Sequence, residues 1–256
     1  MFRQRLRLGF RVVGDQRFLS HLDTMRLWER ALRRAGLPLR MSEGFNPRPR
    51  ISLPEPRSVG VASDAEILEF ELADWVSPDA ILAGLSRQVP EGIRIASLDL
   101  VRPSDKARPA AVVYVADSSS PAEAAGGLQR AGPPAPPLRA VWPADLADRI
   151  ARLLAADRLA VVRHRPTGDK PLDARPFIES LELQGTGSRE PGTGRSEPQP
   201  SEPGSRTPNP AVQVIRMVLR TGPKGTVRPD EILRLLGLDA EAVARANIRR
   251  TEIRLG

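Results

Sequence analysis

Apolar and polar residues alternate along the first dozen positions of the chain. The apolar positions are Phe2, Leu6, Leu8, Phe10 and Val12. The positions between them carry Arg3, Arg5, Arg7 and Arg11. A period of two residues is typical of a strand that buries one face and exposes the other. The pattern therefore predicts a half-buried strand over residues 2–12.

The spacing of apolar residues then changes to that of a helix. Ser20 stands at a capping position with Asp23 three residues later, which is the spacing of a capping box. Gly36 stands where a helix commonly ends in the left-handed conformation. We predict a helix between these residues, with a buried stripe formed by Leu22, Met25, Trp28, Leu32 and Ala35.

The rest of the first hundred residues completes a regular order of elements. Short strands are predicted over residues 37–41 and 50–53, and a longer alternating strand over residues 66–72. Ser77 followed by a proline predicts the start of a helix that extends to about Gln88. A strand over residues 92–101 closes the series. The order β-α-β-β-α-β is that of the ferredoxin-like split βαβ arrangement.

The second half repeats this order less clearly. Strands are predicted over residues 111–116, 159–165, 212–220 and 248–255, and helices over residues 143–156, 175–183 and 228–236. Residues 118–137 are rich in proline and small residues, which indicates a loose connection. Residues 184–210 contain almost no apolar residue, so we expect a disordered insertion there. The predicted fold class is α+β, with tandem ferredoxin-like units at residues 1–103 and 108–256.

Charge and composition narrow the classes of partner. The 256 residues have a formal net charge of +8, and arginine supplies 36 of the 39 basic residues. An excess of basic residues favours acidic binding partners, of which nucleic acid is the first candidate. The chain has no cysteine, which excludes disulfides, thiol catalysis and cysteine-bound metal. We see neither a secretory signal nor a stretch long enough to span a membrane, and therefore expect a soluble cytoplasmic protein.

A stiff loop at residues 42–52 is the first candidate binding element. Its two prolines fix the backbone, and Arg48 and Arg50 project to one side of the extended segment. Phe45 adds a flat apolar face beside Gly44. Guanidinium groups and an aromatic ring on a rigid backbone suit RNA. The alternative is a structural crossover in which Phe45 fills the core and the arginines are solvated.

The predicted helix adds further arginines to this candidate site. Its polar face and the turn before it complete a predicted nucleic-acid-binding set of Arg17, Arg26, Arg30, Arg33, Arg34, Phe45, Asn46, Arg48 and Arg50. The arginines of the first strand lie in a different setting. Arg3, Arg5 and Arg7 could bind RNA across a sheet, but the interleaved aromatic residues of such sheets are missing. We favour cross-strand pairing of these arginines with Glu69 and Glu71 on a neighbouring strand.

Two weaker candidates involve proton transfer and anion binding. His21 is either a partly buried residue of the first helical turn or a general acid or base acting on an RNA 2′-hydroxyl. The loop with Gly222, Lys224 and Gly225 precedes a helix and is either an anion cradle or a plain turn. Two histidines exclude a histidine-rich metal site, and a mixed site with Asp15, Asp23 or Asp173 stays open but lacks a recognised spacing. We expect neither a metal site nor a cofactor.

Several short segments resemble a known family as a set. They are the run Gly14–Asp23, the run Arg30–Gly36, Gly44-Phe45-Asn46-Pro47, the run Asp173–Ile178, the run Arg220–Pro223 and the run Arg249–Glu252. Together they resemble the radical SAM-associated domain family of unknown function. That family's loop usually has histidine and lysine at the positions of Arg48 and Arg50, so the positive charge is kept and the histidine is not.

The resemblance implies a partner of a cobalamin-binding radical SAM enzyme with no established activity of its own. Combined with the basic balance, it leads us to expect a non-catalytic accessory protein that binds structured RNA. The alternatives are a metal-independent ribonuclease or RNA-modifying enzyme that uses His21, and an adaptor that contacts only the radical SAM partner.

Overall fold

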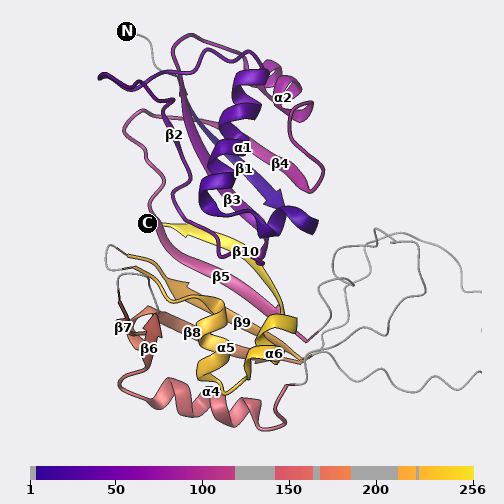
Figure 1. The fold of residues 1–256 in the computed structure, drawn as a ribbon, viewed down its shortest axis with the longest axis vertical. Coiled ribbons are helices and arrows are strands. Elements are labelled where there is room, and N and C mark those ends of the chain that lie inside the picture. Colours follow the sequence, from indigo (N-terminus) through magenta and orange to yellow (C-terminus); the bar gives the residue numbers. More distant parts are fainter. Residues whose placement is uncertain (1–3, 119–141, 164–167, 186–212, 223–224) are drawn as a thin grey trace, which may run out of the picture.

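The computed structural model describes residues 4–118, 142–163, 168–185, 213–222 and 225–256. One eight-stranded sheet runs through these residues in the order β4-β1-β3-β10-β5-β9-β8, and the short β2 also pairs with β3 (Figure 1). The chain is therefore a mixed α/β protein dominated by a single mixed sheet with few helices.

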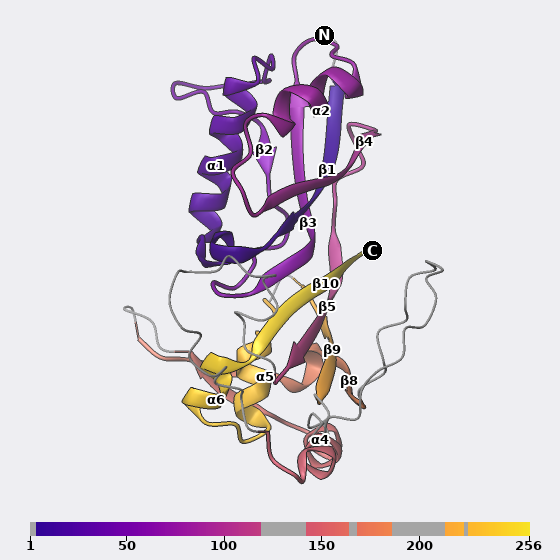
Figure 2. The same cartoon turned by 90° about the vertical axis from the view of Figure 1, so that its right-hand side faces the viewer.

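The first half follows the predicted order of elements. These elements are β1 (Gln4–Val12), a 3-10 turn (Gly14–Phe18), α1 (His21–Arg34), β2 (Ile51–Ser52), β3 (Ala62–Leu72), α2 (Pro78–Ser86) and β4 (Ile93–Val101). Both helices pack on one face of the strands (Figure 2). The apolar face of β1 is buried as predicted, and Phe10 meets Trp28 of α1 edge to face with ring centroids 4.8 Å apart.

Helix α1 begins and ends where the sequence predicts. The Ser20 hydroxyl oxygen accepts a hydrogen bond from the Asp23 N–H at 3.2 Å, and Gly36 has a φ of +69°. One member of the predicted stripe is misplaced, because Leu22 is 65% exposed. Thr24 is buried instead, and its hydroxyl donates to the Ser20 carbonyl.

The segment between α1 and β3 forms less strand than predicted. Residues 37–41 contribute only isolated bridges, at Leu39 and Met41, and the second predicted strand is reduced to the two residues of β2. Five prolines in this segment lack the N–H that a ladder needs, which explains the short pairing.

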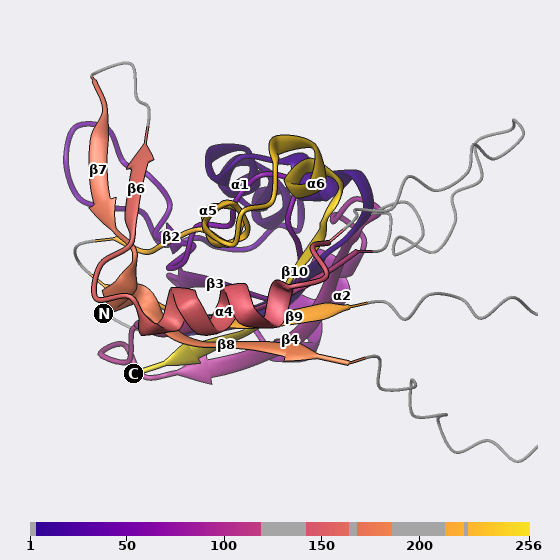
Figure 3. The same cartoon turned by 90° about the horizontal axis from the view of Figure 1, so that it is seen from below.

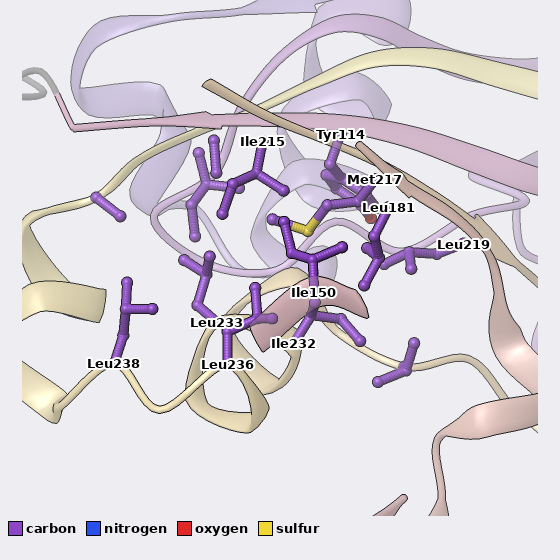
Figure 4. Close-up of a cluster of buried hydrophobic side chains, with 14 of the residues drawn as sticks. Tyr114, Ile150, Leu181, Ile215, Met217, Leu219, Ile232, Leu233, Leu236 and Leu238 are labelled. Carbon is purple, nitrogen blue, oxygen red and sulfur yellow. The ribbon is translucent and has the colours of Figure 1, made fainter. Parts of the chain in front are cut away.

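The second half contains two small additions to the predicted elements. Its elements are β5 (Pro109–Asp117), α4 (Leu146–Ala155), β6 (Ala160–Arg163), β7 (Lys170–Asp173), a 3-10 turn (Arg175–Phe177), β8 (Ile178–Gln184), β9 (Val214–Arg220), α5 (Pro229–Leu235), α6 (Ala240–Arg245) and β10 (Asn247–Leu255). Strands β6 and β7 form a separate two-stranded arm that projects from the main sheet (Figure 3). Helices α4 and α5 enclose a core around Ile150, Met217 and Ile232 (Figure 4).

The predicted helix over residues 175–183 is wrong. Only Arg175–Phe177 make a helical turn, and the chain then enters strand β8. The pairing of β8 with β9 shifts register between Ile178 and Ser180. This irregularity lets Ile178 and Leu181 both bury their side chains three residues apart, which is the spacing of a helix.

The two halves meet at a short parallel contact between β3 and β10. Arg249 pairs with Ala62 and Arg250 with Ser63. The strand order is β4-β1-β3-β2 on one side of this contact and β10-β5-β9-β8 on the other. Because one sheet joins both sides, the architecture does not by itself establish two ferredoxin-like units.

Two predictions fall largely outside the described residues. The loose connection at residues 118–137 and the insertion at residues 184–210 belong, apart from their first residues, to segments that the structure leaves undescribed. In the part of the chain that is described, each helix is too short or too polar to cross a bilayer.

Candidate functional site

The polar face of α1 exposes four of the predicted arginines. Arg26 lies 3.4 Å from Asp23, and Arg33 lies 2.9 Å from Glu29, so each has an acidic neighbour on its own helix. Arg30 and Arg34 are exposed and form no ion pair with any described residue. The helix therefore presents at least two guanidinium groups whose charge is not neutralised locally.

The loop after α1 is closed by its own backbone. The Ser42 N–H donates to the Arg48 carbonyl at 2.7 Å, and the Arg48 N–H donates to the Ser42 hydroxyl at 3.0 Å. Gly44 inside the loop has a φ of +119°, which a residue with a side chain rarely adopts. Phe45 at the tip is fully exposed, so the alternative in which it fills the core is wrong.

Arg48 and Arg50 are exposed, and neither forms an ion pair within the described ranges. The backbone of Arg50 is nevertheless fixed. Its N–H donates to the Arg40 carbonyl at 2.9 Å, and its carbonyl accepts from the Glu71 N–H of β3 at 3.1 Å. The loop and the C-terminal end of α1 lie at the same end of the molecule (Figure 1). We call Arg30, Arg34, Arg48 and Arg50 the arginine surface, a set defined by exposure and by the lack of an ion pair with any described residue. It is not confined to one face of the sheet, because α1 covers one face and Arg50 lines a pocket on the other.

The structure does not bring all nine predicted residues together. Asn46 is exposed in the loop, but Arg17 precedes α1 and lies at the opposite end of that helix. The Arg17 guanidinium stacks on Phe18, 4.7 Å from the ring centroid, and its Nε is buried without a partner in the described chain. Burial lowers the pKa of Arg17 against a smaller opposing effect of Asp15. Arg17 therefore does not belong to the arginine surface, because it lies at the other end of α1 and stacks on Phe18.

His21 lies beside a hollow that is too small for a nucleotide. The hollow, which Glu55, Arg57 and Glu66 also line, has a volume of about 10 Å³. That is room for about one water molecule. Asp23 does not orient His21, because its carboxylate accepts from the Ser20 hydroxyl at 2.7 Å.

The weak anion loop is seen only in part. Lys224 lies outside the described residues. Gly222 and Gly225 exchange two backbone hydrogen bonds of 3.1 and 2.9 Å, which makes the loop a closed turn. Across the described ranges, acidic and histidine side chains nowhere gather in a group of three or more that would hold a metal ion.

The predicted cross-strand pairs on the open face of the sheet are present. Arg5 Nη2 lies 2.6 Å from Glu69 Oε2, and Arg7 Nη2 lies 2.9 Å from Glu69 Oε1. Glu71 pairs with Arg5 at 3.3 Å. Burial raises the pKa of Glu69, but hydrogen bonds from Arg5, the Ala107 N–H and Arg7 together outweigh it and leave that pKa below its ordinary value.

A buried charge cluster that the sequence analysis did not predict lies where the two halves meet. Arg250 of β10 is 0% exposed. It donates to the Glu66 carboxylate at 3.1 Å and to the Tyr114 hydroxyl at 3.1 Å, and it also reaches the Glu55 and Pro56 carbonyls. Arg57 approaches the same Glu66 at 3.9 Å and donates to three backbone carbonyls. We call Glu55, Arg57, Glu66, Tyr114 and Arg250 the junction cluster.

In the junction cluster, burial is the largest cause of the pKa shifts of Glu55, Arg57 and Tyr114. Burial raises the pKa of Glu55, against a smaller opposing effect of Arg250. Burial lowers the pKa of Arg57, and Glu66 partly offsets this. The pKa of Tyr114 is raised by burial despite the nearby Arg250. The shift of the Glu55 pKa is thus in the direction that favours the neutral carboxyl.

A cavity of about 480 Å³ opens beside the junction cluster. Its wall includes Glu55, Arg57, Tyr114, Arg163, Thr226 and Arg228. Most of the cationic side chains in this wall already have acceptors. Arg163, for example, donates two hydrogen bonds of 2.6 and 2.7 Å to the Glu231 carboxylate. Arg228 is the exposed cation of this wall, so the cavity offers less free positive charge than the arginine surface.

No local sequence pattern predicts the junction cluster. Its members are spread from position 55 to position 250, and only the β3–β10 contact assembles them. The one available signal was the run Arg249–Glu252, which carried the family resemblance but had no predicted role.

These features define a class of protein, namely a mixed α/β protein with an exposed arginine surface and a buried charge cluster between its halves. The chain belongs to the family described as uncharacterized proteins conserved in bacteria (DUF2344), whose model matches residues 5–229.

Other comparisons add no functional information. No curated protein matches the chain. The crystal structure of an unknown protein from Galdieria sulphuraria aligns with 99% of this chain and 100% of that chain, at 11% identity and a TM-score of 0.25. That TM-score is too low to carry an argument about fold or function.

Proposed function

We propose that the protein is a non-catalytic RNA-binding accessory protein of a radical SAM enzyme. The observation that carries the RNA part is the arginine surface, in which Arg30, Arg34, Arg48 and Arg50 are exposed without acidic partners in the described chain. Unpaired guanidinium groups retain the charge and the donors that phosphate groups require.

The loop supports binding of unpaired or looped nucleotides. Its backbone is closed by two hydrogen bonds, so ordering it on binding needs little conformational entropy. The exposed ring of Phe45 offers a face on which a base can stack. Stacking of a base on an aromatic side chain contributes about 1–3 kcal/mol without demanding a particular sequence.

The radical SAM partner rests on the family resemblance of the short motifs. Co-purification tests this part: a radical SAM enzyme should be recovered with the tagged native protein, and its consistent absence would remove the partner from the proposal. A cytoplasmic location belongs to the same proposal, because it is where RNA and such an enzyme would meet the protein.

The matching strand orders on both sides of the β3–β10 contact support a second proposal, that each half is a ferredoxin-like unit. In a crystal structure, β1, β2, β3 and β4 should superpose on β5, β8, β9 and β10 strand for strand, with the helices on the same face. Helices on opposite faces would contradict this.

Binding of a labelled RNA hairpin at low salt tests the RNA proposal. A variant with glutamine in place of Arg30, Arg34, Arg48 and Arg50 should bind at least tenfold more weakly, since each lost phosphate contact removes about 1 kcal/mol or more. The control replaces four exposed arginines elsewhere, namely Arg11, Arg87, Arg94 and Arg158, of which Arg158 lies 3.8 Å from Asp173. Equal loss in both variants would mean that net charge alone attracts RNA.

The same preparation separates the alternatives. If His21 were catalytic, incubation with total RNA would yield fragments that the His21→Ala variant does not produce. If the protein were an adaptor only, it would recover the radical SAM enzyme but no RNA. The water-sized hollow beside His21 supports the non-catalytic alternative.

A further inference from the structure

A second basic feature lies on the open face of the sheet, where the chain leaves the first half. After β4 the segment 102–107 crosses this face as a strap. The Pro103 and Asp105 carbonyls accept from Arg5 and Arg7, and the Ala107 N–H donates to Glu69. Between the strap, β1, β2 and β3 is a cavity of about 240 Å³, which we call the strap pocket.

Five cations surround the two carboxylates of this region. Arg5, Arg50 and Lys106 line the strap pocket together with Glu69 and Glu71. Two more arginines reach the same carboxylates from outside it, because Arg7 bonds Glu69 and Arg40 bonds Glu71 at 2.9 Å. Asp99, which lies opposite Arg7 on β4, is a further strand away from the strap pocket.

The carboxylates have little capacity left for the remaining cations. Both oxygens of Glu69 are occupied, by Arg7 and the Ala107 N–H on one side and by Arg5 on the other. Glu71 likewise accepts from Arg5 through one oxygen and from Arg40 through the other. Arg50 and Lys106 have no ion pair among the described residues. Arg50 and Lys106 therefore line a pocket whose two carboxylates, Glu69 and Glu71, already pair with other arginines.

Arg5, which lines the strap pocket, also has an unsatisfied donor. Arg5 is 6% exposed, and its Nε is buried with no hydrogen-bond partner in the described chain. A buried N–H without an acceptor is costly, and native structures usually supply one. Ser52, an exposed residue of the pocket wall, adds a hydroxyl as a neutral donor.

We propose that the strap pocket binds the terminal phosphate of an RNA strand. A phosphate monoester carries nearly two negative charges at neutral pH, whereas each internal phosphodiester carries one. The excess of cations over carboxylates matches the dianion better. The volume is below the roughly 300–1,000 Å³ typical of pockets for whole small ligands, which fits a phosphoryl group rather than a complete nucleotide.

The position of Arg50 links this site to the arginine surface. Arg50 belongs to both, so an RNA strand bound through the loop at Arg48 and Arg50 can place its end in the strap pocket. The inference rests in this respect on the proposed RNA-binding function. The phosphoryl chemistry of the strap pocket is independent of that function and can be tested without RNA.

Matched RNA hairpins test the terminal-phosphate site. One carries a 5′-phosphate, one a 3′-phosphate and one hydroxyls at both ends. The wild-type protein should bind one phosphorylated hairpin about tenfold more tightly than the hydroxyl form, the effect of one or two charge-assisted hydrogen bonds. Lys106→Ala should remove this preference and leave the affinity for the hydroxyl hairpin unchanged. Lys170→Ala, which changes an exposed lysine on β7, should keep the preference.

A phosphorus NMR titration with inorganic phosphate separates the two proposals. If no hairpin binds, the RNA-binding function fails. Broadening of the phosphate signal by the wild type but not by Lys106→Ala would then still support a phosphoryl site that serves a free ligand. Equal affinity for all three hairpins with no broadening would overturn the inference. A preference that Lys106→Ala leaves intact would also overturn it, because the phosphate would then bind elsewhere.

Discussion

At the scale of single residues, Arg250 shows how charge is used inside this protein. Its side chain is 0% exposed, yet it has a carboxylate, a phenol hydroxyl and two backbone carbonyls as acceptors. A guanidinium group has five donors in a planar fork, so one arginine can connect several segments that a lysine could not. Here the segments come from both halves of the chain.

Replacing Arg250 should therefore destabilise the protein strongly. Arg250→Met leaves Glu66 buried with only Arg57 nearby, and removal of one partner from a buried ion pair costs about 3–5 kcal/mol. Urea unfolding at neutral pH measures this loss. The double variant Arg250→Met, Glu66→Leu should recover part of it, because no unpaired carboxylate remains. A single variant as stable as the wild type would contradict the role of Arg250.

Glu55 should make stability depend on pH in the opposite sense to an ordinary carboxylate. Burial raises the pKa of Glu55 in the folded state, so the proton is bound more tightly there than in the unfolded chain. Its favourable contribution is complete below the ordinary pKa of about 4.3 and is lost as the pH rises through the raised value. Glu55→Gln should therefore raise the melting temperature at pH 8, and the difference should shrink toward pH 4. A lower melting temperature for Glu55→Gln at pH 8 would show that the charged form is needed.

At the scale of elements, α1 could be predicted from its helix cap, and β1 and β3 from the alternation of apolar and polar residues. Each carries its own signal, which for α1 is the Ser20 cap and the glycine after its last turn. Strand β8 was predicted wrongly as a helix, because its irregular register buries Ile178 and Leu181 at the spacing of a helix. Helix α6 was missed because its six residues are too few to establish a helical period.

The cap of α1 is the element-scale feature with the most direct consequence. The Ser20 hydroxyl accepts from the Asp23 N–H and donates to the Asp23 carboxylate. Ser20→Ala removes both bonds and should lower the free energy of unfolding by about 1 kcal/mol. Ser20→Asp, which can cap the same N–H, is the control but places a second carboxylate beside Asp23. Thermal unfolding compares the three proteins, and no difference for Ser20→Ala would show that the cap adds no net stability.

At the scale of the whole molecule, the candidate sites differ in how far the sequence could locate them. The arginine surface depends on one helix and the loop after it, so local patterns were sufficient for most of its residues. The junction cluster and the strap pocket require the sheet order and the path of residues 102–107, neither of which is encoded locally. The predicted nucleic-acid-binding set also included Arg17, which the structure places at the end of α1 opposite to the loop.

The continuous sheet predicts that both halves unfold together. Trp28 and Trp142 are buried in separate cores, one in each half, and Trp75 is exposed. In variants that keep only Trp28 or only Trp142, fluorescence should follow the same urea transition as far-UV circular dichroism. Two separate transitions would instead support independent domains with the predicted boundaries at residues 103 and 108.

The salt dependence of RNA binding tests the central claim most directly. For the wild type, the logarithm of the association constant should fall steeply and linearly with the logarithm of salt concentration. For the variant with glutamine at Arg30, Arg34, Arg48 and Arg50, the slope should be shallower by roughly three, since each phosphate contact contributes about 0.7–0.9. Identical slopes for the two proteins, or no binding by the wild type at low salt, would contradict the account.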